Sequence, residues 1–122
     1  MKRIVTTFVL LILSAAASAS PINFDCKFSR EASPDGIKDS KFNLSFILDD
    51  AAKKAYITGD NGSAEVVYIP NVKGMTFIEI TPVGNVMVTA ISYKDNSTVH
   101  SRNGIIFDKL IPTQFYGKCL KR

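Results

Sequence analysis

The chain has 122 residues, with 15 Lys and Arg against 11 Asp and Glu, one His, two Cys and no Trp. This length fits one domain. Without Lys2 and Arg3 the net charge falls from +4 to +2, and the remaining basic residues are not clustered as nucleic-acid binding requires. One His and two Cys are also too few for a zinc site. The composition therefore speaks against a nucleic-acid partner and against a metal cofactor.

The first 19 residues have the order of a cleavable secretory signal. Met1-Lys2-Arg3 is a basic start, residues 4–13 form an apolar run, and Ala17-Ser18-Ala19 is the small-residue pattern of a cleavage site. We expect residues 1–19 to be a signal peptide and 20–122 to be a single all-β domain. The apolar run is too short to span a bilayer, so no transmembrane segment is expected after cleavage. The protein should be periplasmic or secreted.

Short β-strands are predicted through the first half of the mature chain. Residues 23–28 form the first strand, and residues 29–41, with Pro34-Asp35-Gly36, are predicted to be a polar loop. Strict alternation then places four apolar side chains on one face of a half-buried strand: Phe42, Leu44, Phe46 and Leu48. Residues 55–58 are a short strand, and Gly59-Asp60-Asn61-Gly62 is a strong hairpin turn signal.

The second half continues in the same way. Further strands are predicted at residues 64–69, 75–81, 86–93, 97–102 and 112–120, and residues 105–107 extend the fourth of these past a kink at Asn103-Gly104. About eight short strands at regular spacing indicate an antiparallel meander barrel or a strongly curved sheet. Most predicted strands are shorter than the roughly 9 to 11 residues of a tilted membrane-spanning strand. That length disfavours an outer-membrane barrel.

The two cysteines lie at opposite ends of the predicted domain. Cys26 is in the first strand and Cys119 is in the last, and in a closed meander these strands are neighbours. An exported protein favours a disulfide over two free thiols. We therefore predict a Cys26–Cys119 bridge that joins the first and last strands.

Few residues suggest chemistry. Ser101 follows His100 directly and would point to the opposite face of a strand, so no Ser-His-Asp arrangement is predicted. Glu79, flanked by apolar residues, would need a partner if buried, and we predict a buried or half-buried ion pair with Arg102. The candidate polar site consists of Glu79, His100, Arg102 and Tyr116. No catalytic set, cofactor or metal ligand is predicted.

Three segments resemble a group of small exported proteins of Gram-negative bacteria. They are residues 77–84, residues 99–102 and the tail Pro112-Thr113-Gln114-Phe115-Tyr116-Gly117-Lys118-Cys119. The group has a cysteine in its first strand and a tail of the form Pro-Ser-Gln-Tyr-x-Gly-x-Cys. This chain departs from it at Thr113 and Phe115. The resemblance implies the architecture and no activity. A weaker likeness is to periplasmic lysozyme inhibitors, which are small disulfide-closed β-barrels.

The sequence leaves two classes of function open. The favoured class is a non-catalytic binding or accessory protein that acts through its surface or a barrel mouth on an envelope or secreted protein. A periplasmic protein inhibitor, similar to lysozyme inhibitors, is the sharper form of this class. The alternative is a small enzyme that uses Glu79 as an acid or base with His100 or Tyr116 nearby.

Overall fold

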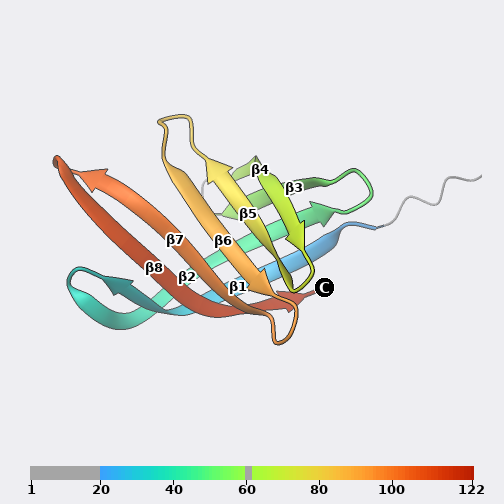
Figure 1. Cartoon of the computed structure of the whole chain (residues 1–122), viewed down its shortest axis with the longest axis horizontal. Helices are drawn as coiled ribbons and strands as arrows, with labels where there is room; N and C mark the ends of the chain where they lie inside the picture. Colours follow the sequence, from blue (N-terminus) through green and yellow to red (C-terminus); the bar gives the residue numbers. More distant parts are fainter. Residues whose placement is uncertain (1–19, 60–61) are drawn as a thin grey trace, which may run out of the picture.

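Eight antiparallel strands form a closed barrel in which each strand pairs with the next and the last pairs with the first (Figure 1). The computed structural model describes residues 20–59 and 62–122. The strands are β1 (Ile22–Ser33), β2 (Gly36–Asp49), β3 (Lys54–Gly59), β4 (Gly62–Asn71), β5 (Gly74–Ile80), β6 (Val86–Ser92), β7 (Ser97–Ile106) and β8 (Lys109–Lys121). The predicted signal peptide lies outside the described residues.

The structure confirms the predicted all-β fold, an antiparallel meander barrel of about eight strands. Asp60 and Asn61 lie outside the described residues, but Gly59 and Gly62 on either side of them are paired across the predicted β3–β4 hairpin. Through the described part of the chain, no helix is long and apolar enough to cross a membrane.

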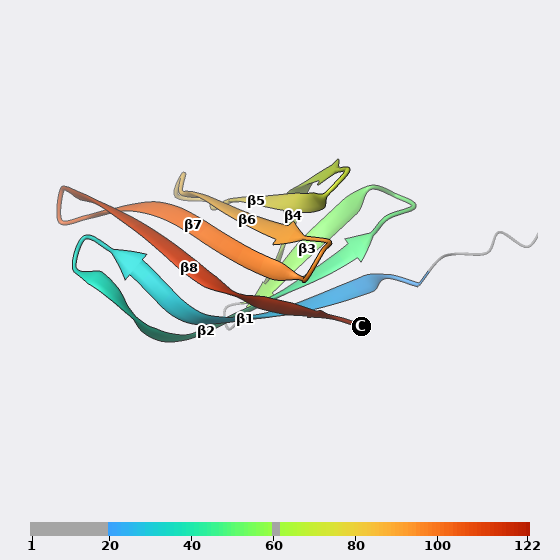
Figure 2. The same cartoon turned by 60° about the horizontal axis from the view of Figure 1, so that its bottom comes forward.

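The two ends of the barrel differ. The tips of the β1–β2, β5–β6 and β7–β8 hairpins lie at one end, on the left of Figure 1, and the C-terminus lies at the other (Figures 1 and 2). We call the end with the hairpin tips the open end. At this end the β1–β2 and β7–β8 hairpins extend furthest (Figure 1). Along their shared edge, β1 and β8 remain paired with each other as far as Ala32 and Gln114.

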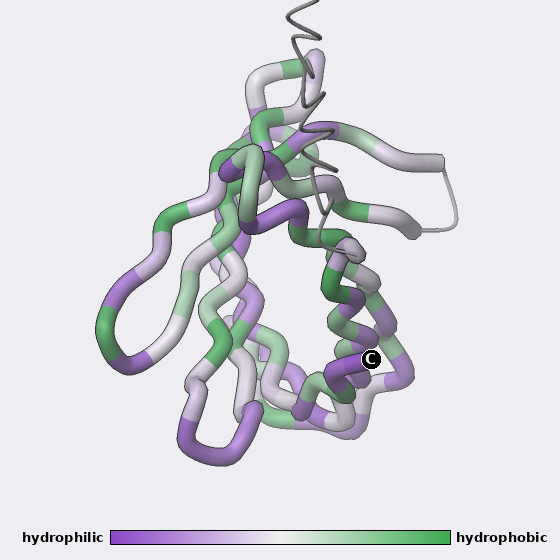
Figure 3. Tube along the Cα trace, turned by 90° about the vertical axis from the view of Figure 1, so that its right-hand side faces the viewer, coloured by the Kyte–Doolittle hydropathy of each residue, from purple (hydrophilic) through white to green (hydrophobic). Residues whose placement is uncertain are grey.

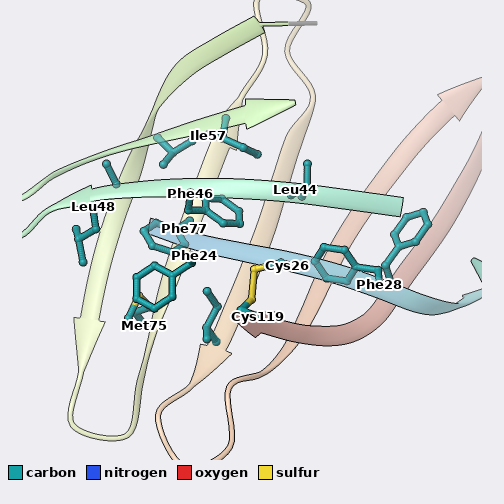
Figure 4. Close-up of a cluster of buried hydrophobic side chains, with 14 residues drawn as sticks. Phe24, Cys26, Phe28, Leu44, Phe46, Leu48, Ile57, Met75, Phe77 and Cys119 are labelled. Carbon is teal, nitrogen blue, oxygen red and sulfur yellow. A yellow bond between two sulfur atoms is a disulfide. The ribbon is translucent and has the colours of Figure 1, made fainter. Parts of the chain in front are cut away.

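Aromatic and aliphatic side chains fill the barrel. Viewed nearly along its axis, the chain forms a closed ring (Figure 3), and alternating residues of each strand point inside it. The largest fully buried side chains include Phe28, Phe46, Phe77 and Ile91. The rings of Phe46 and Phe77 stack with centroids 4.5 Å apart (Figure 4). The alternation predicted for residues 42–48 is confirmed, since Leu44, Phe46 and Leu48 are buried and Phe42 packs against them.

The predicted polar loop at residues 29–41 is wrong. After a register shift between Phe28 and Arg30, β1 continues to Ser33, and β2 begins at Gly36. Only Pro34 and Asp35 separate the two strands. These hairpin arms extend beyond the core, so most of their residues are exposed or half-buried and no face is apolar. A strand without a buried face leaves no alternation in the sequence.

Several strands are longer than the sequence indicated. β1, β2 and β8 have 12, 14 and 13 residues, so the length argument against an outer-membrane barrel fails. The interiors of the two kinds of barrel can be compared instead of the strand lengths. Outer-membrane barrels have a polar interior and an apolar outer band, whereas this barrel encloses an apolar core. The kinked segment predicted at residues 97–107 is the single strand β7, which ends at Ile106.

The seam between β1 and β8 carries the predicted disulfide. Cys26 and Cys119 are directly opposite in the register, their Cα atoms are 3.9 Å apart, and their sulfurs are bonded (Figure 4). Gly117, two residues before Cys119, lies opposite Phe28 where β8 approaches β1 closely. A Cβ there would collide with the backbone of Lys27 and Phe28. This close approach gives a physical reason for the glycine in the tail sequence.

We expect the disulfide to account for much of the barrel's stability. It spans 93 positions of the chain, and the loss of chain entropy from closing so long a loop corresponds to roughly 4–5 kcal/mol. Replacing both cysteines with Ala should lower the free energy of unfolding by about that amount in urea melts of the mature protein. Intact-mass analysis with alkylation, before and after reduction, checks the bond itself. Two thiols that alkylate without reduction would contradict it.

Gly117→Ala should destabilise the barrel by about 1–3 kcal/mol or more, because the new methyl group forces β8 away from β1. Gly104→Ala is the matched control: a Cβ at Gly104 meets its nearest atom at an ordinary distance of 3.9 Å, so its effect should stay within about 1 kcal/mol. Urea melts of both variants, under conditions that keep the disulfide, make the comparison. Equal effects would show that the close approach at the seam does not constrain this position.

Candidate functional site

A cavity opens at the open end of the barrel. Its volume is about 440 Å³, and all strands from β2 to β7 contribute to its lining. Tip residues of the β3–β4 hairpin, Gly59 and Gly62, and Pro82 of the β5–β6 loop also line it. We call it the mouth cavity. The lining includes the apolar side chains of Phe42, Leu44 and Met87 and the polar side chains of Glu79, His100 and Arg102.

The strand register brings the charged residues of the mouth cavity into one row. Glu79 is opposite Met87, Met87 is opposite Arg102, and Arg102 is opposite Thr113. Directly opposed residues of neighbouring strands point to the same side of a sheet. Glu79 shares its face with the buried Met75 and Phe77, so the whole row points into the barrel.

The predicted Glu79–Arg102 ion pair is not formed. Within residues 20–59 and 62–122, the ion pairs are Lys38–Glu31, Lys53–Asp50 and Arg122–Asp25. Glu79 and Arg102 are two strand spacings apart, which is about 10 Å between their backbones, with Met87 between them. The guanidinium of Arg102 instead packs over the rings of Phe42 and Phe115, with its carbon 5.4 Å and 4.7 Å from the ring centroids.

His100 lies deeper in the barrel than Arg102 and is 1% exposed. Its Nδ1 is 2.7 Å from Oγ1 of Thr89, the residue opposite it on β6. The rings of Phe28, Phe42 and Phe115 surround it at centroid distances of 5.9, 5.5 and 5.9 Å. Its Nε2 has no hydrogen-bond partner in the described part of the chain. Burial lowers the pKa of His100 to about 4, and the charge of Arg102 contributes, so the imidazole is neutral at pH 7.

Tyr116 does not belong to this site. It is on the outer face of β8, where its hydroxyl donates a hydrogen bond to Oε1 of Gln114 at 2.6 Å. The other three candidate residues, Glu79, His100 and Arg102, line the mouth cavity together. The structure therefore groups three of the four predicted residues and separates Tyr116, because residues 115 and 116 point to opposite faces of a strand.

Sequence reasoning missed two parts of the open end. Thr89 looked like any residue of a β-prone run, and only the register shows that it faces His100.

The second part that sequence reasoning missed is the tip of the β7–β8 hairpin, where four large apolar side chains are exposed. Ile105, Ile106, Phe107 and Leu110 are 73%, 53%, 98% and 67% exposed. We call these four residues the apolar tip. The Ile-Ile-Phe run in the sequence was a signal for it.

The apolar tip has no neighbouring strand. β6 pairs with β7 only up to Arg102, and β1 pairs with β8 only down to Gln114, so residues 103–112 pair with each other alone. At the turn, Phe107 and Asp108 have φ angles of 49° and 61°. This left-handed conformation suits Gly, Asn or Asp and is rare for a bulky residue such as Phe.

Among the residues that the structure describes, no group of three or more His, Cys, Asp or Glu side chains is arranged to hold a metal ion. Comparison of the chain with protein-family models, with curated proteins and with solved structures finds no match. The resemblance to small exported β-proteins therefore stays a prediction, and the function must be argued from the geometry.

The buried His100 should make stability depend on pH. Its pKa is about 4 in the fold and about 6.5 in the unfolded chain. Between these values only the unfolded chain takes up the proton, so stability falls as the pH decreases from 6.5 to 4. The full loss is about 3 kcal/mol.

A double variant isolates this effect. His100→Phe combined with Thr89→Val removes the imidazole and does not leave the Thr89 hydroxyl unpaired. Urea melts at pH 7 and at pH 4.5 should show a smaller loss of stability in the variant than in the wild type, because carboxylates common to both proteins cancel in the difference. An identical pH dependence in the two proteins would contradict a buried neutral His100.

Proposed function

We propose that the protein is an exported, non-catalytic binding protein that docks on an envelope or secreted protein through its open end. The observation that carries the proposal is the apolar tip. Large exposed apolar side chains gathered at one place mark interaction sites more often than isolated ones do. Here four of them stand on a two-stranded hairpin that extends past its neighbours.

The backbone at the tip supports a binding role. A non-glycine residue in the left-handed region costs on the order of 1–3 kcal/mol, and such strain gathers at functional sites. Phe107 has this conformation and is almost fully exposed, so its ring gains no packing energy in the free protein. A partner with an apolar cleft would bury that ring, and the free energy of this burial would offset the backbone strain at Phe107.

The non-catalytic part of the proposal rests on the chemistry of the mouth cavity. His100 is buried and its pKa is about 4, which is too far below 7 for an efficient general acid or base at neutral pH. Tyr116 is on the outer face. The enzyme alternative then depends on Glu79 with His100 alone.

The N-terminal sequence supports export. The basic start, apolar run and Ala-x-Ala pattern agree with a signal peptide, and a disulfide is compatible with an oxidising compartment.

Insertion of a projecting hairpin into a cleft is also a way in which one protein can block another. An inhibitor of an envelope or secreted enzyme, similar to lysozyme inhibitors, is therefore the sharper form of the proposal.

Phe107→Asn tests the tip. Asn tolerates a positive φ, so we expect the variant to be about 1 kcal/mol more stable than the wild type in urea melts. Capture of partner proteins from envelope extract by the immobilised variant should fall at least tenfold. Val72→Asn is the matched control, since Val72 is 93% exposed on the β4–β5 turn at the other end of the barrel, and it should capture as the wild type does.

Equal capture by all three proteins would overturn docking through the tip. A titration against lysozyme separates the sharper form. Inhibition by the wild type and by Val72→Asn, but not by Phe107→Asn, supports an inhibitor. Full lysozyme activity at saturating protein would remove lysozyme as the target.

A further inference from the structure

Arg102 has the features of an anion-binding group. Its planar guanidinium packs over two rings, and this stacking leaves the N–H donors free, since they lie in the plane of the group. No carboxylate in the described residues is within ion-pair distance of it. The fork of donors matches a carboxylate, which it can bind through two parallel hydrogen bonds.

Glu79 places a second charge across the same cavity. It lies in the same row as Arg102 but two strands away, with Met87 between them, which is too far for direct contact. A ligand that carried only a carboxylate would face this like charge. A ligand with a carboxylate and a nearby N–H donor would satisfy both residues at once, because the carboxylate could face Arg102 while the donor faced Glu79.

The rest of the mouth cavity suits an apolar body. Phe42, Leu44, Ile57 and Met87 line it, and the flexible Met side chain adapts to different shapes. Its volume of about 440 Å³ is within the range of small-molecule sites. His100 also lines the cavity, and its Nε2 is buried with no partner in residues 20–59 and 62–122. A buried polar atom without a partner is costly, and a polar group or water brought by a ligand would satisfy it.

We propose that the mouth cavity binds an α-amino carboxylate with an apolar side chain, either as a free amino acid or as the last residue of a peptide. Arg102 binds the carboxylate, Glu79 accepts a hydrogen bond from the ligand nitrogen, and the apolar side chain contacts Phe42, Leu44 and Met87. The apolar tip does not line this cavity. The proposal is therefore independent of docking through Phe107.

Three probes separate the possible outcomes: leucine, N-acetylleucine and leucinamide. The mature protein, labelled with ¹⁵N and ¹³C, is titrated with each at pH 7, and the signals of the Arg102 Nε–H group and the His100 ring are followed. Shifts with leucine and N-acetylleucine, but not with leucinamide, indicate a site that accepts a peptide end. Shifts with leucine alone indicate a free amino acid. Equal shifts with leucinamide, or no shift with any probe, overturn the proposal.

Variants assign the roles. Arg102→Gln should weaken leucine binding at least tenfold, whereas Arg30→Gln, which changes an exposed arginine outside the cavity, should not change it. Glu79→Gln should weaken binding of leucine more than that of N-acetylleucine, because only leucine carries a positive charge on its nitrogen.

Phe107→Asn should bind leucine as the wild type does, so failure of the cavity and failure of the tip can be told apart. If Arg102→Gln does not fold, the three probes on the wild-type protein still decide the question. Undiminished leucine binding by a folded Arg102→Gln variant would overturn the role of Arg102.

Discussion

The seam between β1 and β8 is the constraint on which the rest of the molecule depends. A curved sheet of eight strands encloses an interior only if its last strand pairs with its first. Here that pairing is fixed by the Cys26–Cys119 disulfide and by the close approach of Gly117 to the backbone of β1. Closure brings together side chains that are distant in the sequence. Phe115 is on β8, the direct neighbour of β7, but Arg102 of β7 meets Phe42 of β2 only because the sheet is closed.

Within the closed barrel, polarity increases in layers toward the open end. The register defines three successive rows across β5, β6 and β7. The deepest contains Met75, Ile91 and Thr98, the next contains Phe77, Thr89 and His100, and the outermost contains Glu79, Met87 and Arg102. This order follows from solvation. A neutral imidazole with one hydrogen bond can lie in the middle row, whereas charges are kept where solvent reaches them.

The sequence predicted the interior better than the edges. Alternation of apolar residues identified the strands that face the core, because one buried face is what produces alternation. The arms of the β1–β2 hairpin bury neither face, so the same reasoning mistook them for a loop. Tyr116 could have been excluded from the site. Cysteines are commonly buried, so Cys119 could be expected to point inward, and Tyr116 lies an odd number of residues from it on the same strand.

The Glu79–Arg102 prediction failed for a different reason. Both residues were assigned to strands, and both do point inward, but a pair also requires neighbouring strands in the right register. That information is not in the local sequence, since the position of Met87 between them depends on the length and geometry of the β5–β6 connection. Register between strands is set by turns and by the buried pattern together, and a single sequence gives only part of each.

Three exceptions to ordinary sequence–structure preferences lie at or near the open end of the barrel. They are a bulky residue in the left-handed region at Phe107, a buried imidazole with an unpartnered nitrogen at His100, and an inward-facing arginine without a carboxylate at Arg102. Toward the other end, the hydroxyl of Thr98 is also buried without a partner in the described residues. The positive φ angles there belong to Asn96, which tolerates them, and to the exposed Lys53, which pairs with Asp50. Proteins depart from such preferences mainly where function requires it. The strained Phe107 and the inward-facing Arg102 without a carboxylate partner both lie at the open end, which makes that end, rather than the outer wall, the place to look for a partner.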